Sequence, residues 1–197
     1  MTRPLILFAH GAGAGSSHPW MQRWAARLDE VGAVRTFDHA YIQAGRRLPP
    51  RANTLVEPHR QVLEEARAEH PGPVVLAGKS MGSRVGCHVA LESDVQALVC
   101  FGYPLRSPAG VLRDQVLLET RTPILFVQGS RDPLCPLDRL AEVRRRMTAP
   151  NVLHVVEGGD HSLQLRKGDL KRLGTDQGSV DAAALDAVAS FLVDVLR

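Results

Sequence analysis

A serine stands between two glycines at residues 78–82, whose sequence Gly-Lys-Ser-Met-Gly fits the pattern G-x-S-x-G. The preceding residues 74–77 are aliphatic and predict a buried strand, and residues 83–92 are compatible with a helix. Strand, tight turn, serine and helix together indicate a nucleophile elbow, which lifts the hydroxyl above the sheet. The glycines are needed because strand and helix approach too closely there for a Cβ atom. We therefore predict that Ser80 is a nucleophile.

A serine hydroxyl needs a base within hydrogen-bond reach, and the base needs an acid that orients it. The expected chain order for this elbow is serine, acid, histidine. Asp132 stands on the turn that follows a predicted strand at 123–128, and His161 stands on a glycine-bearing loop after a predicted strand at 152–156. We predict Asp132 as the acid and His161 as the base.

Other residues compete for these two roles. Asp138 lies in a predicted helix, and Asp160 adjoins the histidine, where it is better suited to orienting the loop. His154 lies inside the last predicted strand, from which its side chain cannot easily reach over the edge of the sheet. The strand-exit positions therefore favour Asp132 and His161.

An acyl-transfer intermediate also needs two N–H donors for its oxyanion. The backbone of Met81, directly after the nucleophile, is expected to supply one. The second is expected from the glycine-rich loop at residues 10–15, which follows the first predicted strand and lets main chain approach closely. We predict Ala12 as this donor, with Gly13 in reserve.

Two nucleotide-binding motifs are partly matched and are disfavoured. A phosphate-binding P-loop that ends in Gly-Lys-Ser requires a glycine where Pro73 stands, and residues 74–77 are strand-forming rather than glycine-rich. The glycines of residues 11–15 have the wrong spacing for a dinucleotide fingerprint, and Asp38 is the only acidic residue at the end of the second predicted strand. We expect no organic cofactor and no metal.

The 197 residues carry a formal net charge of +3 and have the composition of a globular protein. The length predicts one domain, residues 1–197. No apolar run approaches membrane-spanning length, and residues 5–9 are too short for a secretory core, so we expect a first strand there and a cytoplasmic protein without a membrane partner.

The densest basic run is Arg144-Arg145-Arg146, on a predicted helix without aromatic residues that could stack on bases. It favours a solvated helix face over a nucleic-acid surface. The three cysteines are widely spaced and lack metal-type pairs, which predicts reduced thiols. They are Cys87, Cys100 and Cys135.

Aliphatic runs alternate with amphipathic segments along the chain, which predicts a three-layer α/β sandwich with a mostly parallel sheet of about six strands. Ser179 is a candidate cap for the last helix, and the loops at 40–53 and 103–110 are too short to form a lid domain. The strands are expected at 4–9, 34–37, 73–77, 97–101, 123–128 and 152–156, and the other helices at 19–31, 54–70 and 137–147.

The chain resembles the α/β-hydrolase superfamily over nearly its full length, and more closely the small lidless group around dienelactone hydrolase and the KANL/TEX-type hydrolase-like proteins. The resemblance implies Ser80 as nucleophile, Asp132 as acid, His161 as base and a hydrolase without a cofactor. The two leading antiparallel strands and the cap of the larger superfamily are missing, which implies a minimal fold with an open site. The motifs that carry the resemblance are at residues 10–13, 45–47, 78–84, 103–105, 112–114, 126–132 and 160–162.

Together these observations predict a serine hydrolase, a carboxylesterase or thioesterase acting on small acyl substrates. The alternative is a binding or scaffold protein on a hydrolase fold, because some members of the group are scaffolds in chromatin complexes. Arg46 and Arg47 are candidates for attracting an anionic substrate, although solvated surface is the preferred interpretation. Cys135, close behind Asp132, is a candidate for the mouth of the site. The sequence leaves the physiological substrate and the oligomeric state open.

Overall fold

A computed structural model of the chain describes residues 3–197. Its centre is a six-stranded sheet in the order β2-β1-β3-β4-β5-β6, and every neighbouring pair is parallel. The predicted three-layer α/β architecture with a parallel sheet is therefore confirmed. The strands are β1 Leu5–Ala9, β2 Ala33–Phe37, β3 Val74–Lys79, β4 Ala97–Phe101, β5 Ile124–Gly129 and β6 Asn151–Val156.

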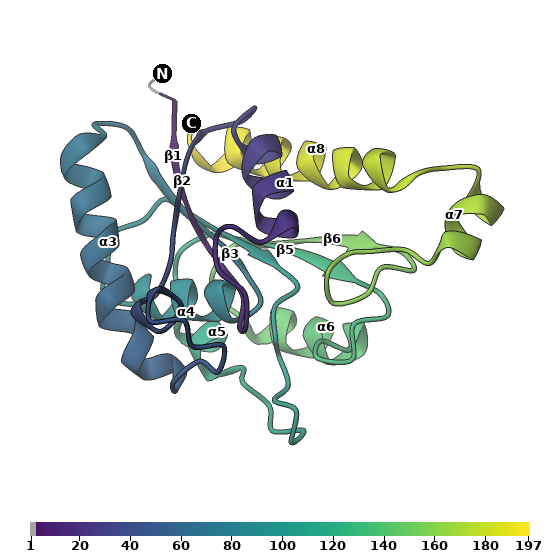
Figure 1. The fold of residues 1–197 in the computed structure, drawn as a ribbon, viewed down its shortest axis with the longest axis horizontal. Helices are drawn as coiled ribbons and strands as arrows, with labels where there is room; N and C mark the ends of the chain where they lie inside the picture. The colour runs from purple at the N-terminus through teal and green to yellow at the C-terminus, as the bar shows by residue number, and fades with distance from the viewer. Residues whose placement is uncertain (1–2) are drawn as a thin grey trace.

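Helices cover both faces of the sheet, with α1 and α8 on one face and α3, α4, α5 and α6 on the other (Figure 1). The helices are α1 Pro19–Leu28, α2 Ala40–Gln43, α3 Val56–Glu69, α4 Met81–Val89, α5 Gln115–Glu119, α6 Leu137–Arg146, α7 Lys167–Leu173 and α8 Gln177–Val195, with a 3-10 turn at Ala52–Leu55.

The continuous aliphatic runs divide between two cores because successive side chains of a strand point to opposite faces. In β1, Leu5 and Leu7 belong to the core beneath α3 and α4, whereas Ile6 and Phe8 belong to the core beneath α1 and α8. All five β1 residues are buried. Runs without polar alternation are therefore what a sheet covered on both faces requires.

The last helix begins earlier than predicted. Ser179 is not its cap: Asp176 holds the N-cap position, and its carboxylate accepts a hydrogen bond from the Ser179 N–H at 2.7 Å. Asp176 is as good a cap as serine. Because the helix begins directly after Asp176, Gln177 is the first residue of its first turn. Three short helices, α2, α5 and α7, were not predicted; α7 has no buried side chain and hence no apolar stripe to reveal it.

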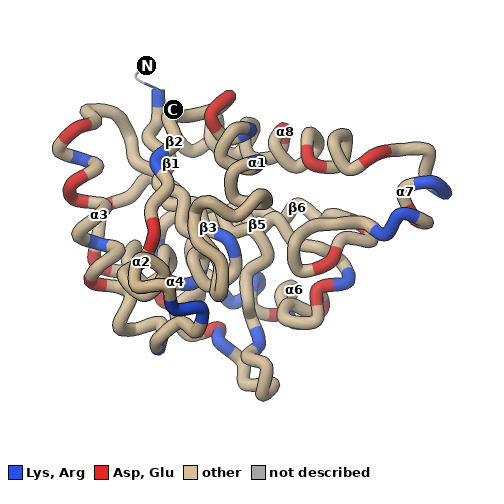
Figure 2. The backbone as a smooth tube through the Cα atoms, viewed as in Figure 1, with Lys and Arg blue, Asp and Glu red and all other residues tan. Residues whose placement is uncertain are grey.

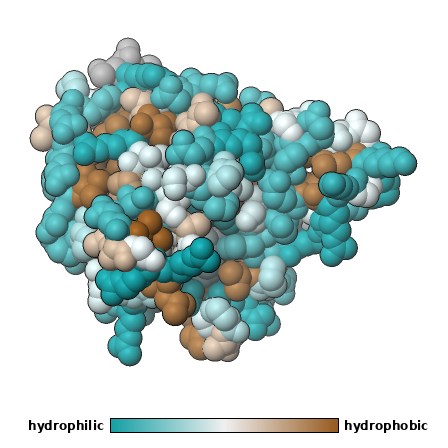
Figure 3. Space-filling view, in the orientation of Figure 1, coloured by the Kyte–Doolittle hydropathy of each residue, from teal (hydrophilic) through white to brown (hydrophobic). Residues whose placement is uncertain are grey.

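The surface carries charges of both signs. Along α3, basic and acidic residues alternate and pair one turn apart, as in Glu57 with Arg60 and Glu64 with Arg67 (Figure 2). The face seen in Figure 3 is mostly hydrophilic, with small separate apolar patches. Within residues 3–197, no helix combines the length and the apolar character that crossing a bilayer demands.

Candidate active site

Three predicted site residues lie at the same edge of the sheet. Ser80 follows β3, Asp132 follows the end of β5 by three residues, and His161 follows β6 on the loop that leads to α7. Parallel strands that run side by side end at a common edge, so residues 81 positions apart in the chain meet there (Figure 1).

The turn that carries Ser80 has a strained backbone. Ser80 adopts φ 51° and ψ −111°, a conformation that L-residues rarely take, between the end of β3 and the first residue of α4. A Cβ on Gly78 would overlap the backbone of Ser83, and one on Gly82 would lie 2.5 Å from the Ala9 carbonyl oxygen. Both glycines are therefore needed for β1, β3 and α4 to approach one another, as predicted.

A chain of hydrogen bonds joins the serine, the histidine and the acid. His161 Nε2 lies 2.8 Å from Ser80 Oγ, and His161 Nδ1 lies 2.7 Å from Asp132 Oδ2. With Nδ1 protonated and donating to the carboxylate, Nε2 is left as the acceptor of the serine proton. The structure thus brings all three predicted side chains into direct contact.

Asp132 is buried, with 3 % of its surface exposed, and both of its oxygens accept hydrogen bonds. Gln128 Nε2 donates to Oδ2 at 2.6 Å, and the Leu134 N–H donates to Oδ1 at 2.8 Å. Burial alone would raise the pKa of this carboxyl. The hydrogen bond and the charge of His161, together with the Leu134 and Gln128 donors, hold the pKa below its usual value. The acid is therefore ionised at neutral pH.

The competing residues lie away from the serine. Asp138 is on α6, with an exposed side chain near Arg139. Asp160 organises the histidine loop, because its Oδ1 accepts the Ser162 N–H at 2.7 Å and the Gln164 N–H at 3.0 Å. His154 lies within β6, paired in register with Val127.

A pocket of about 380 Å³ opens above Ser80 and His161. Apolar groups dominate its wall, among them Ala12, Trp20, Met21 and Leu134. A larger apolar hollow of about 480 Å³ lies at the opposite edge of the sheet, near Arg3 and Leu192, and offers no nucleophile. The pocket over the serine is therefore the one that combines chemistry with room for a small acyl group.

The two predicted oxyanion donors border this pocket. Ala12 is part of its wall, and Met81 is the first residue of α4, so its N–H belongs to the free donors at that helix N-terminus. Within residues 3–197, no acceptor takes the N–H of Ala12 or Met81. Gly13, the reserve donor, has φ +80°, a conformation that favours glycine.

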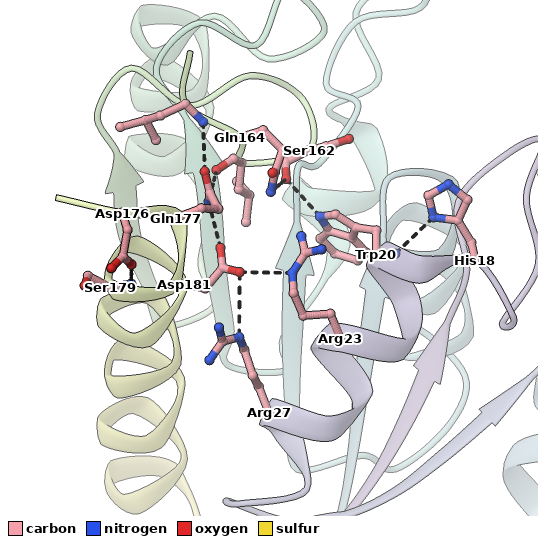
Figure 4. A network of polar contacts seen from close by, with 12 residues as sticks. His18, Trp20, Arg23, Arg27, Ser162, Gln164, Asp176, Gln177, Ser179 and Asp181 are labelled. Carbon is pink, nitrogen blue, oxygen red and sulfur yellow. Dashed lines mark hydrogen bonds and ion pairs between the residues drawn. The ribbon is translucent and has the colours of Figure 1, made fainter. Parts of the chain in front are cut away.

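The loop after His161 is held by side chains from two helices. Trp20 of α1 donates its Nε1–H to the Ser162 carbonyl at 2.8 Å, and Gln177 of α8 binds the Leu163 carbonyl and the Leu165 N–H, each at 3.0 Å (Figure 4). Leu163 itself has φ 62°, which is unfavourable for a residue other than glycine. These contacts offset that strain and determine the path of the loop.

A buried carboxylate joins those two helices. Asp181 of α8 is 1 % exposed and accepts from Gln177 Nε2 at 2.8 Å, and it pairs with Arg23 and Arg27 of α1 at 3.1 and 3.6 Å (Figure 4). The same glutamine that binds the histidine loop is thus oriented by an ion-paired acid. Sequence reasoning missed Trp20 and Gln177 as site-supporting residues because their partners lie more than ten positions away.

Of two other predictions about the rim, the one for Cys135 is wrong and the one for Arg46 and Arg47 agrees with the structure. Cys135 does not line the mouth: it is 1 % exposed, and burial raises the pKa of its thiol to about 12. Its neighbour Leu134 lines the pocket instead, since the turn after Asp132 points the cysteine into the core. Arg46 and Arg47 are exposed and lie outside the pocket wall, in agreement with solvated surface.

A cluster of buried histidines lies beside the loop after β1. His39 and His59 are buried, and their four ring nitrogens have no partner within the described residues. Burial, with the charges of the neighbouring histidines, lowers the pKa of His39 to about 4 and that of His59 to about 3. Both rings are therefore neutral in the folded protein at neutral pH.

This cluster predicts acid sensitivity. In the unfolded chain these histidines take up protons near pH 6.5, whereas the folded protein resists protonation until about pH 4 and 3, respectively. The free energy of unfolding should therefore fall as pH drops from 6.5 to 4, by up to roughly 1.4 kcal/mol per pH unit for each histidine. Urea unfolding between pH 4 and 7 measures this slope. His59→Leu is expected to reduce it by about half; an unchanged slope would contradict the assignment.

Comparisons with known proteins agree with this architecture. The family model described as an alpha/beta hydrolase domain matches residues 2–192. An α/β serine hydrolase homologue from Coxiella burnetii is similar in structure, at 20 % identity and TM-score 0.70, over 88 % of this chain and 82 % of that one. Dienelactone hydrolase from Anabaena variabilis matches with the same identity and TM-score, over 100 % and 88 %. A lidless α/β serine hydrolase from Xanthomonas campestris matches at 18 % identity and TM-score 0.69, over 87 % and 79 %.

Proposed function

We propose that this chain, which belongs to the α/β-hydrolase domain family, is a serine carboxylesterase or thioesterase that acts on small acyl substrates. The observation that carries the proposal is the continuous hydrogen-bonded path from Ser80 through His161 to the ionised Asp132, next to an apolar pocket. Membership of the family supports hydrolase function, and the small apolar pocket over Ser80 supports an ester or thioester substrate.

In the first half of the reaction, Ser80 Oγ attacks the substrate carbonyl carbon while His161 Nε2 accepts the hydroxyl proton. Asp132 keeps Nδ1 protonated and stabilises the imidazolium that forms. The amides of Ala12 and Met81 donate to the oxyanion, assisted by the positive end of the α4 dipole. The tetrahedral intermediate then collapses: the bond to the leaving group breaks, and His161 returns the proton to the departing alcohol or thiol.

In the second half, a water molecule takes the place of the leaving group. His161 removes one of its protons as the oxygen attacks the acyl-Ser80 carbonyl. The bond between the acyl carbon and Ser80 Oγ breaks, the proton passes to the serine, and the carboxylic acid leaves. The net reaction is hydrolysis, and it consumes only water and the ester.

The pocket argues for a short acyl chain. Its volume of about 380 Å³ is near the lower limit of small-molecule sites, and its wall is mostly apolar. The polar residues that line it besides Ser80 and His161 are His18, Lys79 and Ser162. Trp20 and Met21 bring α1 over one side, while Leu134 borders the other. An acetyl or butyryl group can bury its apolar surface there, whereas longer chains extend into solvent.

A panel of p-nitrophenyl esters and matching thioesters from acetyl to dodecanoyl tests the proposal. We expect kcat/KM to be highest for two to four carbons and to decline beyond about eight. A fluorophosphonate probe is expected to label Ser80, as located by peptide mass spectrometry. An inactive protein that the probe leaves unlabelled would instead indicate a binding or scaffold role on a hydrolase fold.

A further inference from the structure

A buried ammonium lies directly behind the histidine. Lys79, the last residue of β3, is 8 % exposed, and its Nζ donates a hydrogen bond to the His161 carbonyl oxygen. The same Nζ lies 5.4 Å from the ring centroid of Trp20, in the range of a cation–π contact. The residue next to the nucleophile in the chain thus binds the backbone of the predicted base.

Burying this charge costs free energy, which indicates that the charge has a role. Burial lowers the pKa of Lys79 to about 8, and the carboxylates of Asp132 and Asp160 recover only part of the lost hydration. A methionine of similar length would fill the same space without that cost. The one hydrogen-bond acceptor that the structure gives the ammonium, within residues 3–197, is the carbonyl of His161.

Gly102, which follows β4, also packs closely against the His161 carbonyl. A Cβ at Gly102 would lie 2.6 Å from the His161 carbonyl oxygen, 3.1 Å from Lys79 Nζ and 3.5 Å from His161 Nδ1. Gly102 also has φ +58°. Gly102 and the ammonium thus both pack closely against the carbonyl of His161, and a small displacement there moves the ring.

The backbone of the loop that carries His161 is strained at Leu163, and this strain favours movement of the loop. Beyond His161, Leu163 is held at φ 62°. Trp20 and Gln177 bind this part of the loop through neutral groups, and the Asp160 carboxylate accepts two of its backbone N–H groups. A hydrogen bond from a charged donor is about twice as strong as a neutral one. The bond from Lys79 is made to the backbone of the histidine, whereas Ser80 and Asp132 bind its ring.

We propose that Lys79 is a positioning residue for the hydrolysis inferred above: its ammonium holds the His161 backbone so that the ring stays between Ser80 and Asp132. The inference rests on the proposed function for its kinetic consequence, although the contact itself exists without it. Lys79 also lines the pocket over Ser80. Its proposed effect on the rate comes from the position of His161 rather than from binding of the substrate.

Kinetics of Lys79→Met and Lys79→Arg on p-nitrophenyl acetate test this role, with the exposed Lys171→Met on α7 as the matched control. We expect Lys79→Met to lower kcat about 10²-fold, as a displacement of about 1 Å does, with KM within about twofold of the wild type. The control should leave both constants unchanged. A large rise in KM with kcat preserved would overturn the proposal and assign the ammonium to substrate binding, and an unchanged kcat would overturn it as well.

The pH profile separates a charged clamp from simple packing. The ammonium is present below its pKa of about 8 and is lost above it, so wild-type kcat should decline as pH rises from 7 to 9.5. Lys79→Arg keeps its charge throughout this range and should lack that decline. A decline of the same size in Lys79→Arg would contradict the clamp.

A proton NMR measurement keeps this test independent of turnover. The Nδ1 proton that His161 shares with Asp132 is expected to give a resonance far downfield of the amides in wild type, and to broaden or vanish in Lys79→Met through exchange with solvent. Retention of a sharp resonance in folded Lys79→Met would overturn the positioning role. If the wild type hydrolyses no ester, the proposed function fails while this measurement still decides the role of Lys79.

Discussion

Replacing Ser80 with alanine should lower kcat on a short p-nitrophenyl ester by at least about 10³-fold, because nucleophile, base and acid act as a unit. The substitution removes one oxygen atom whose one side-chain hydrogen bond, among residues 3–197, is to His161 Nε2. Alanine has a Cβ like serine, so the substitution adds no strain to the turn at φ 51°. The fold should therefore persist while turnover falls to the level given by the pocket and the oxyanion donors alone.

The exposed Ser190→Ala on α8 is the matched control and should keep wild-type kcat. Circular dichroism and thermal melting establish that both variants are folded. Fluorophosphonate labelling should disappear in Ser80→Ala and remain in the control. Equal turnover by wild type and Ser80→Ala would remove Ser80 from the chemistry and, with it, the proposed mechanism.

Asp132→Asn is expected to reduce kcat by about 10³ to 10⁴, the loss that follows when an acid of this kind is made neutral. Asp132 accepts three hydrogen bonds, from His161, Gln128 and Leu134. Asparagine has one oxygen and one NH₂ group, so one of these donors must face another donor. When the NH₂ faces His161, the ring must carry its proton on Nε2, and it can no longer accept the proton of Ser80.

Asp138→Asn on α6 is the matched control for this substitution, since its side chain is exposed and lies near Arg139. It should change kcat by less than about twofold. The two variants also decide between the acids that the sequence left in competition. Full activity in Asp132→Asn, or a large loss in Asp138→Asn, would assign the acid elsewhere.

The pKa of Asp132 adds a dependence on pH that activity and stability share. Because the folded-state pKa is held below its usual value, the carboxylate contributes stability above the unfolded-state pKa, and this contribution is lost as pH falls through the folded-state value. The stability that the neutral histidines contribute begins to fall near pH 6.5, their unfolded-state pKa, whereas the contribution of Asp132 begins to fall near pH 3.8, its unfolded-state pKa. Loss of stability between pH 6.5 and 4 reports on His39 and His59, and loss at still lower pH includes Asp132.

Much of the fold could be predicted because the signals were local. The four inner strands are largely apolar runs of five or six residues, whereas the edge strands β2 and β6 also carry polar residues. The observed strands agree with the predicted ranges within two residues at each end. Buried parallel strands need apolar side chains on both faces, which leaves a pattern visible in the sequence alone. The strained turn at Ser80 was visible for a similar reason, because only glycine tolerates the close contacts at 78 and 82.

Features that depend on distant partners could not be predicted. Trp20 looked like a core residue on an amphipathic helix, and it is one, but its indole N–H also reaches Ser162, 142 positions away. Cys135 followed Asp132 closely enough to suggest the pocket mouth, yet the turn directs it into the core. Nothing nearby in the sequence distinguishes these outcomes, since the orientation of a side chain after a turn depends on what packs against it.

The sequence alone therefore determined the strands and the placing of the candidate residues Ser80, Asp132 and His161 after strands that end at one edge of a parallel sheet. Hydrophobic periodicity and glycine-bounded turns involve neighbouring residues, so both can be recognised in the sequence. Tertiary structure alone decided that the three side chains touch, that Gln128 and Leu134 complete the shell of the acid, and that a buried ammonium lies behind the histidine. Such contacts join residues tens of positions apart, and their geometry exists only once the sheet and its covering helices have packed.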